Sequence, residues 1–329
     1  MYLACNFEVE FPETRGRRKF KFTTVNTFKI DSSWQSLTNN MDLTISKALF
    51  FDEVGKVYQL VKAGDPIVLR GGYNGELMEE FRGFVSQILD DMPVLLKCED
   101  NMYVMKRTGA HKIYKRVKLA QLLRDIVPSQ YKIDAMDVEL GSVELNRTTV
   151  SQTLLMLKDN YGIYSYFVGD TLVSGKIYED NPVTEVVKYC LSGGTKNIIK
   201  NDLKYRTKDD VKIKVRMVNY NDDGTKSEVV VGDDEGQEQR LVCTNHKNAA
   251  DLKVLAQKEL DRLKIDRFSG TLTSFAIPFV QEGYTASIIN TEYPERSGDY
   301  YVDAVTTSLN DMGAYHRVVK IGPRAAKQS

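Results

Sequence analysis

An internal repetition constrains the fold of this chain more than any other feature of its sequence. Segments 61–99 and 280–321 contain the same short elements in the same order: a glycine, a strand, a turn, a second strand, the pattern Leu-x-Asp-Met and a third strand. Gly64 and Gly283 are 219 residues apart, and Met92 and Met312 are 220 residues apart. A strand-like segment precedes each copy, MDLTIS before the first and SGTLTSF before the second. The sequence therefore predicts one β module that is present twice.

The region between the two copies has a different periodicity. Residues Val117–Val127 place Leu119, Leu122 and Ile126 on one helical face, and Pro128 ends the pattern. Residues Ser151–Asn160 are a second predicted helix, and a predicted hairpin follows it. Strand-like alternation returns after this region, so the sequence predicts an α+β domain inserted between two β modules.

We therefore expect a mainly β (α+β) protein with two similar, tube-like β-barrel modules. The predicted domains are residues 1–104 for the first β module, 105–192 for the α+β insert and 193–329 for the second β module. A long helix is predicted at 245–265 within the second module, where Thr244 and Asn245 are candidate N-caps. The insert is expected to be a semi-independent unit on the outside of the assembly, because nothing else in the chain repeats it.

The charge balance gives no sign of a nucleic-acid or membrane-surface protein. The 329 residues contain 45 basic and 45 acidic side chains, so the formal net charge is zero. The sequence has no run of 18 apolar residues, and acidic residues stand near the N-terminus where a signal peptide needs an apolar stretch. We expect synthesis in a cytoplasm, no cleaved signal and no membrane insertion.

The glycine-rich stretch at Gly71, Gly72 and Gly75 has to be tested as a phosphate-binding loop. Such a loop opens a helix, so that its N–H groups and the helix dipole face the anion. Here the next residues form an extended pattern, no Gly-Lys-Ser/Thr follows, and three carboxylates stand close by, at Glu76, Glu79 and Glu80. The stretch is therefore predicted to be a turn between strands.

Candidate metal ligands are scarce or wrongly spaced. The sequence NYNDDG, from Asn219 to Gly224, resembles the start of a calcium loop, but Val230 stands where a bidentate glutamate is required. None of the histidines has a His or Cys neighbour at metal-ligand spacing, and the cysteines form no CxxC pair, so free thiols are expected. These residues are His111, His246, His316, Cys5, Cys98, Cys190 and Cys243.

Candidate catalytic residues are equally hard to select. The carboxylate groups Asp90–Asp91 and 233–235 lie in turn-like contexts, and nothing marks a pair for glycoside hydrolysis. No G-x-S-x-G motif occurs. We therefore predict no catalytic, cofactor-binding or metal-binding residue, no cofactor and no enzymatic activity.

An ordered set of motifs resembles a known family. The motifs are GDPIVLRGGYNGELMEEFRGFVSQI, then LLKCED ending at Asp100, then VSQTLLMLKDNYGIYSYFVGDTLVSGKIY, and finally SGDYYVDAVTTSL. In this order they resemble the hub proteins of contractile phage tails, the family that includes the late control protein of phage baseplates. The motifs span most of the chain. Each motif alone is weakly specific, and their order is what carries the resemblance.

The resemblance implies a structural role. Members of the family have two tube-like β domains per chain and form trimers that join a sixfold tail tube to a threefold spike. This implies homotrimerisation, contacts with tail tube, central spike and other baseplate proteins, and DNA only in transit through the channel. It places the protein in a virion tail or baseplate that is assembled in the bacterial host cytoplasm. Some relatives carry a spike or lysozyme-like domain, and none follows Ile321 here, so the resemblance implies no wall-piercing or wall-digesting activity.

Two other classes of function stay open at the level of sequence. The first is a carbohydrate-binding or adhesin module on a tail, because the chain has 18 tyrosines that can stack on sugars. The tyrosines are dispersed, however, and Trp34 is the single tryptophan. The second is a peptidoglycan hydrolase, which the sequence supports less, because it shows no acid, nucleophile or metal group for the reaction.

Overall fold

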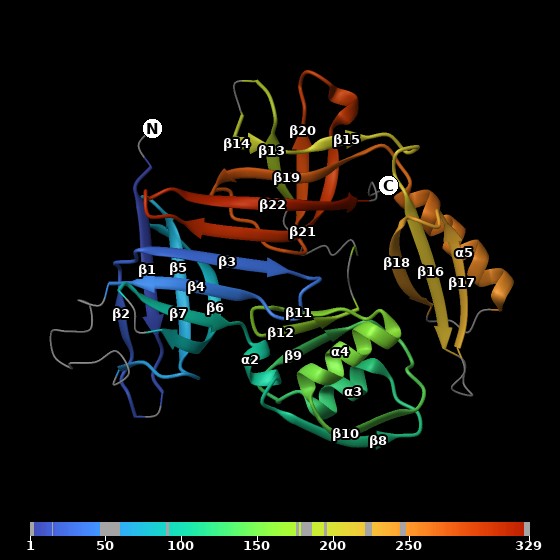
Figure 1. Ribbon diagram of the computed structural model, residues 1–329, viewed down its shortest axis with the longest axis horizontal. Coiled ribbons are helices and arrows are strands. Elements are labelled where there is room, and N and C mark those ends of the chain that lie inside the picture. The colour runs from blue at the N-terminus through green and yellow to red at the C-terminus, as the bar shows by residue number, and fades with distance from the viewer. Residues whose placement is uncertain are drawn as a thin grey trace.

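One large sheet organises the computed structural model (Figure 1). The structure describes residues 3–14, 16–46, 60–89, 92–175, 178, 186–193, 196–220, 226–243 and 248–325. Within these residues, fourteen strands form a single hydrogen-bonded sheet, and the remaining strands form three small sheets. The mainly β, α+β fold class predicted from the sequence is confirmed.

The first module occupies one end of this sheet. Its strand order is β3-β4-β7-β6-β5-β1-β2, and all of its strand pairs are antiparallel. In β4 the residues Met41, Leu43 and Ile45 are buried while Asn40 and Asp42 are exposed, which is the alternation of a half-buried strand. The strands are β1 (Cys5–Phe11), β2 (Phe20–Phe22), β3 (Thr27–Ser33), β4 (Asn40–Ile45), β5 (Pro66–Tyr73), β6 (Glu76–Leu89) and β7 (Val94–Glu99).

The second module repeats this arrangement. Its strand order is β14-β19-β22-β21-β20-β13, and the short strand β15 also pairs with β19. The elements are β13 (Val186–Cys190), β14 (Ile198–Asn201), β15 (Lys204–Arg206), β19 (Arg267–Phe275), β20 (Thr285–Ile289), the 3-10 helix η2 (Pro294–Arg296), β21 (Gly298–Leu309) and β22 (Tyr315–Arg324).

The two strand orders correspond position by position. The series β3-β4-β7-β6-β5-β1 matches β14-β19-β22-β21-β20-β13, so the repetition predicted from the sequence is confirmed at the level of strand topology. One pair differs in direction, because β1 is antiparallel to β5 whereas β13 is parallel to β20.

The prediction of two separate barrels is wrong for the described residues. The modules are open sheets that continue into each other, because β3 of the first module pairs with β21 of the second. The physical reason lies in the length of β21. Its first residues pair with β20, and its later residues, from Ala304 onward, pair with β3. The edge of β21 from Ala304 onward therefore pairs with the neighbouring module and does not close a barrel within its own module.

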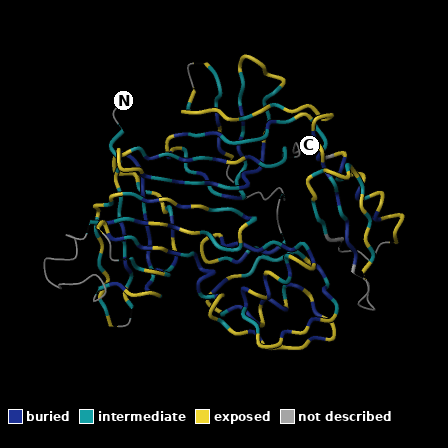
Figure 2. Tube along the Cα trace, viewed as in Figure 1, coloured by how far each residue is buried: buried dark blue, intermediate teal, exposed yellow. Residues whose placement is uncertain are grey.

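The α+β insert has a hydrophobic core of its own (Figure 2). Its elements are α2 (Met102–Met105), β8 (Gly109–Tyr114), α3 (Leu119–Ile126), β9 (Lys132–Ala135), β10 (Val143–Thr149), α4 (Val150–Tyr161), β11 (Ser165–Val168) and β12 (Thr171–Ser174). Both predicted helices are confirmed. Helix α4 begins with a capping box between Thr149 and Gln152 and ends at Gly162, whose φ is 68°.

A further small unit interrupts the second module. Strands β17 (Lys226–Gly232), β16 (Ile213–Tyr220) and β18 (Gln237–Cys243) form a sheet, and α5 (Ala249–Leu263) packs against it. The predicted helix at 245–265 is therefore shorter. Its N-cap is Asn248, whose side chain accepts from the N–H of Asp251, while Thr244 and Asn245 lie outside the described residues.

Candidate assembly interface

The backbone junction between the modules is a run of six paired residues. Strand β21 pairs antiparallel with β3, from Ala304 opposite Ser33 to Leu309 opposite Phe28. Hydroxyl groups reinforce the junction from both strands. Ser32 Oγ donates to the Val305 carbonyl at 3.1 Å, and Thr306 Oγ1 donates to Asp31 Oδ1 at 2.7 Å. The backbone part of the interface is thus a continuous sheet.

A buried ion pair crosses this junction. Arg317 on β22 contacts Glu80 on β6, with Nη2 at 2.7 Å from Oε1 and each side chain 2% exposed. The guanidinium also donates to the carbonyls of Val280 and Ala276 and to Thr307 Oγ1, each at 3.1 Å. A buried ion pair is tolerated only when such additional hydrogen bonds compensate for desolvation. The pair therefore fixes how the two modules meet.

Aromatic side chains surround the ion pair. Tyr315 donates its phenolic proton to Glu80 Oε1 at 2.5 Å, and Tyr73 donates to the Tyr315 carbonyl at 2.8 Å. Burial, which is the largest cause, raises the pKa of Tyr315, so its hydroxyl stays a donor. A Cβ on Gly71 would lie 2.7 Å from the Tyr315 hydroxyl, which explains why glycine occupies this strand position.

A second polar contact lies at the C-terminal end of β3. Trp34 Nε1 donates to Asp303 Oδ1 at 3.1 Å, and Tyr178 donates to the same oxygen at 3.0 Å. Burial raises the pKa of Asp303, while these two hydrogen bonds lower it. The Trp34 ring also makes an edge contact with Tyr164, at a centroid distance of 5.0 Å, so the insert and both modules meet here.

The third polar contact joins the same three parts of the chain. The N–H of Asn39 donates to Asp100 Oδ2 at 3.1 Å, and the Asn39 side chain donates to Glu282 Oε1 at 2.6 Å. The Met102 N–H donates to Asp100 Oδ1 at 2.9 Å, at the start of the insert. Burial raises the pKa of Asp100 to about 7 and also raises that of Glu282. Both carboxyls border a polar cleft together with Arg317.

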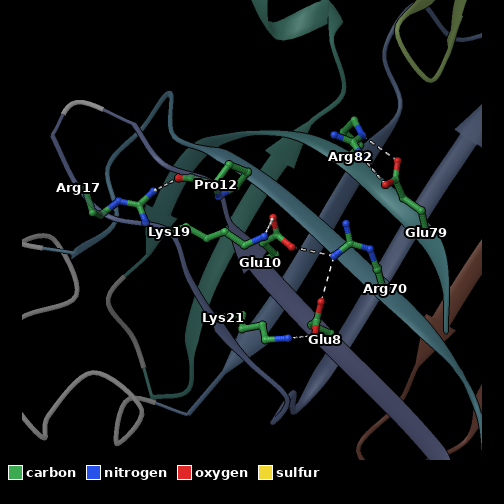
Figure 3. A network of polar contacts seen from close by, with 9 residues as sticks. All are labelled: Glu8, Glu10, Pro12, Arg17, Lys19, Lys21, Arg70, Glu79 and Arg82. Carbon is green, nitrogen blue, oxygen red and sulfur yellow. Dashed lines mark hydrogen bonds and ion pairs between the residues drawn. The ribbon is translucent and has the colours of Figure 1, made fainter. Parts of the chain in front are cut away.

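Figure 3 shows a charged network on and beside β1, β2 and β5. Arg70 Nη1 lies 3.0 Å from Glu8 and 2.9 Å from Glu10, and Lys21 and Lys19 lie 2.8 Å from the same two carboxylates. Hydrogen bonds from Lys21 and Lys19 are the largest causes that lower the pKa of Glu8 and Glu10. Each charge is paired across neighbouring strands, so the network is structural rather than an anion site.

The glycine-rich stretch is a hairpin, as predicted. Gly71 and Gly72 lie within β5, and the turn is at Asn74 and Gly75, whose φ values of 54° and 90° are those of a tight hairpin turn. A Cβ on Gly72 would lie 1.7 Å from the Glu76 carbonyl oxygen, so the strands approach too closely for any side chain.

The remaining sequence candidates are not brought together. His111 is exposed, and His316 makes an edge contact with Phe275 at a centroid distance of 5.9 Å. His246, Asp90, Asp91 and residues 221–225 of the calcium-like loop lie outside the described residues. Cys5, Cys98 and Cys190 are free thiols, as predicted. No group of three His, Cys, Asp or Glu side chains suited to a metal ion occurs among the residues that the structure describes. In that same part of the chain, no helix is long and apolar enough to cross a membrane.

Sequence reasoning missed the buried ion pair, although one signal was available. In the strand from Tyr315 to Ile321, alternate residues are buried, and Arg317 occupies one of these inward positions between apolar neighbours. An arginine on the apolar face of an alternating strand requires a buried partner. The identity of that partner, Glu80, depends on a contact 237 residues away.

Two solved structures with this arrangement are tail proteins. A tail protein from Neisseria meningitidis MC58 has a TM-score of 0.62 at 17% identity and covers 96% of each chain. The 43 kDa tail protein of prophage MuSo2 from Shewanella oneidensis has a TM-score of 0.61 at 14% identity, over 97% of this chain and 98% of that one. The fold is that of phage tail proteins.

A secretion-system protein also has this fold. A type VI secretion component of E. coli, described as structurally similar to the T4 bacteriophage tail proteins gp27 and gp5, has a TM-score of 0.55 at 12% identity. The match covers 91% of this chain and 73% of that one. No protein-family model matches the sequence, and no curated protein matches it. The relationship is thus one of fold.

Proposed function

We propose that this chain is a structural baseplate hub of a phage tail or of a phage-derived device. Three chains form a pseudo-sixfold ring around a channel, and the ring joins the tail tube to the central spike. The observation that carries this proposal is the doubled module, because three chains with two equivalent modules supply six near-equivalent positions around one axis. The fold shared with tail proteins supports the same role.

The two ends of each module suit partners of different symmetry. Rotation about the ring axis keeps equivalent atoms at the same height, so the hairpin tips at Met92 and Met312 lie on one rim and occur six times. Both side chains are highly exposed, at 80% and 89%. These tips are therefore suited to a sixfold tube protein.

The opposite end of the modules carries elements that occur once per chain. The N–H of Met102, at the start of the insert, donates to Asp100, which also accepts from the N–H of Asn39. Asn39 and Asp100 lie at the ends of β4 and β7 away from the Met92 tip. The small unit of β16–β18 and α5 leads into the beginning of β19. That end of β19 pairs with the end of β22 that lies away from Met312. In a trimer these elements occur three times, which suits a threefold spike. We propose the predicted division into 1–104, 105–192 and 193–329 with two changes at its boundaries. Helix α2 (Met102–Met105) goes with the insert, whose core contains Met102, and β13 (Val186–Cys190) goes with the second module, where it pairs with β20.

The proposal assigns the protein to a virion tail or baseplate that is assembled in the bacterial host cytoplasm. Its partners are two further copies of itself, the tube protein, the spike and other baseplate proteins, with DNA only in transit. We assign it no catalytic role, cofactor or metal. Trp34 and at least ten of the 18 tyrosines are buried, which does not favour sugar stacking.

The test is assembly of the full chain with its neighbours. The tube and spike proteins encoded in the same genome are mixed with the chain, and particle masses and electron-microscope images are recorded. The expected result is a ring with three copies of this chain between tube and spike. A Met92→Asp, Met312→Asp variant should keep the trimer and lose the tube. A chain that stays monomeric with both partners present, and is absent from purified tails, would refute the proposal.

A further inference from the structure

Among the described residues, strand β6 has an unpaired edge at the position where β21 meets the other module. Both strands pair with a first neighbour over their N-terminal part, β6 with β5 and β21 with β20. Both form a hairpin over their C-terminal part, β6 with β7 and β21 with β22. The second edge of β21 is then covered by β3 from Ala304 to Leu309. In β6 the corresponding edge, Ser86–Leu89, pairs with no strand among the described residues.

Strand β14 has a complementary open edge in the described part of the chain. It corresponds to β3 in the matched strand orders, since each is the outer neighbour of an equivalent strand, β19 or β4. The strand β3 pairs on both sides, with β4 and with β21. The strand β14 pairs only with β19 in the described part of the chain, and its residues Ile199, Lys200 and Asn201 are exposed. Ile199 is an exposed apolar residue on an open sheet edge, at 42%.

The two open edges do not pair with each other among the described residues of the chain. The strands between β14 and β6 in the sheet order are β19, β22, β21, β3, β4 and β7. In the proposed trimer, the partner that completes both edges is a second copy of the chain. We propose that β14 of one chain pairs antiparallel with Ser86–Leu89 of β6 in the next chain, as β3 pairs with β21 inside each chain.

This inference rests on the proposed hub and specifies how it closes. The contact joins different surfaces of the two copies, so it is head-to-tail and closes only through rotation. Three chains then contain three internal junctions between β3 and β21 and three external junctions between β14 and β6. Backbone pairing also protects edges that otherwise favour aggregation.

The external junction is weaker than the internal one. Arg317 pairs with Thr307, two residues before the end of β21, and Lys97 pairs with Gln87, two residues before the end of β6. Lys97 thus has the hairpin position that Arg317 has, but its side chain is exposed instead of forming a buried ion pair. The internal junction is therefore permanent, while the external one depends on concentration or on the tube and spike.

The test is cysteine cross-linking of the full chain with tube and spike proteins present. Gln87→Cys and Lys200→Cys are made singly and together, because both side chains are exposed on the two edges. A short bismaleimide then links neighbouring thiols. The wild-type chain measures the background from Cys5 and Cys190, which are partly exposed. The double variant should give covalent dimers and trimers and nothing larger, whereas a mixture of the two single variants should stop at dimers.

The alternatives give different products. A mixture that yields no dimer, although mass measurement shows a trimer, overturns the strand pairing and leaves the hub standing. Dimers from Gln87→Cys alone mean that identical surfaces meet, and a ladder beyond the trimer means an open fibre; both overturn the inference. Absence of any trimer refutes the hub itself.

A backbone variant tests the pairing independently. Ile199→Pro removes an N–H from β14 and should weaken association about tenfold. Val186→Pro, at an exposed position of the other edge strand β13, is the control and should leave association unchanged. If both variants associate as strongly as the wild-type chain does, the proposed edge is wrong.

Discussion

Replacement of Arg317 by methionine tests whether the buried ion pair holds the modules together. The change removes hydrogen bonds to the carbonyls of Val280 and Ala276 and to Thr307, as well as the contact with Glu80. It leaves the carboxylate of Glu80, whose side chain is 2% exposed, with the hydroxyl of Tyr315 as its one remaining donor among the described residues. Breaking a buried pair from one side costs about 3–5 kcal/mol, because the other charge stays desolvated.

The only tryptophan of the chain provides the assay. Trp34 is 5% exposed and donates to Asp303 of the second module, so its emission reports opening of the junction. A loss of about 3–5 kcal/mol should lower the urea midpoint by about 1–2 M. The double variant Glu80→Leu, Arg317→Met removes both charges, so it should lose less stability than Arg317→Met alone.

An exposed ion pair on β6, the strand that carries Glu80, is the matched control. Arg82 lies 2.5 Å from Glu79, with the side chains 43% and 37% exposed, so Arg82→Met should cost about 0–1 kcal/mol. If Arg317→Met unfolds at the same urea concentration as Arg82→Met, or if the double variant is the least stable of the series, the assigned role of the ion pair is wrong.

Two further predictions concern a buried acid and a close strand contact. Because burial raises the pKa of Asp100 from 3.8 to about 7, the folded state binds its proton more tightly, and stability should fall by about 4 kcal/mol as the pH rises from about 3 to about 8. Asp100→Asn should reduce this slope in urea titrations at several pH values, with a residual slope from Glu282; an unchanged slope would contradict the assignment. Gly72→Ala should lower the melting temperature strongly, because its Cβ would overlap the Glu76 carbonyl, whereas Gly109→Ala, which meets nothing within 4 Å, should not; equal melting temperatures would contradict this.

The sequence predicted the elements better than their connections. Helices α3 and α4 were identified because their apolar spacing and terminal signals, Pro128 and Gly162, are local properties. The doubled module was predicted because equivalent strands keep similar residues at similar spacing. The open continuous sheet was not predicted, because the pairing of β3 with β21 joins residues about 275 positions apart, and alternation does not identify a strand's neighbour.

The candidate interface depended even more on distant contacts. Asp100, Asn39 and Glu282 each read as an ordinary polar residue in sequence, and only the fold brings them within hydrogen-bonding distance. The small unit of β16–β18 and α5 was predicted as part of the second module. Its separate core, with Val215, Leu252 and Ala256 fully buried, depends on which sheet the helix covers.

The two kinds of junction explain why such a chain benefits from carrying its module twice. Two modules on one chain meet at a high effective concentration, so half of the junctions in the proposed ring form during folding. Those internal junctions contain the ion pair of Glu80 and Arg317 and the hydrogen bond of Trp34 to Asp303. The external junctions lack the buried pair, since Lys97 is exposed. In the proposed ring, closure can then wait for the tube and spike, so that rings do not form before both partners are present.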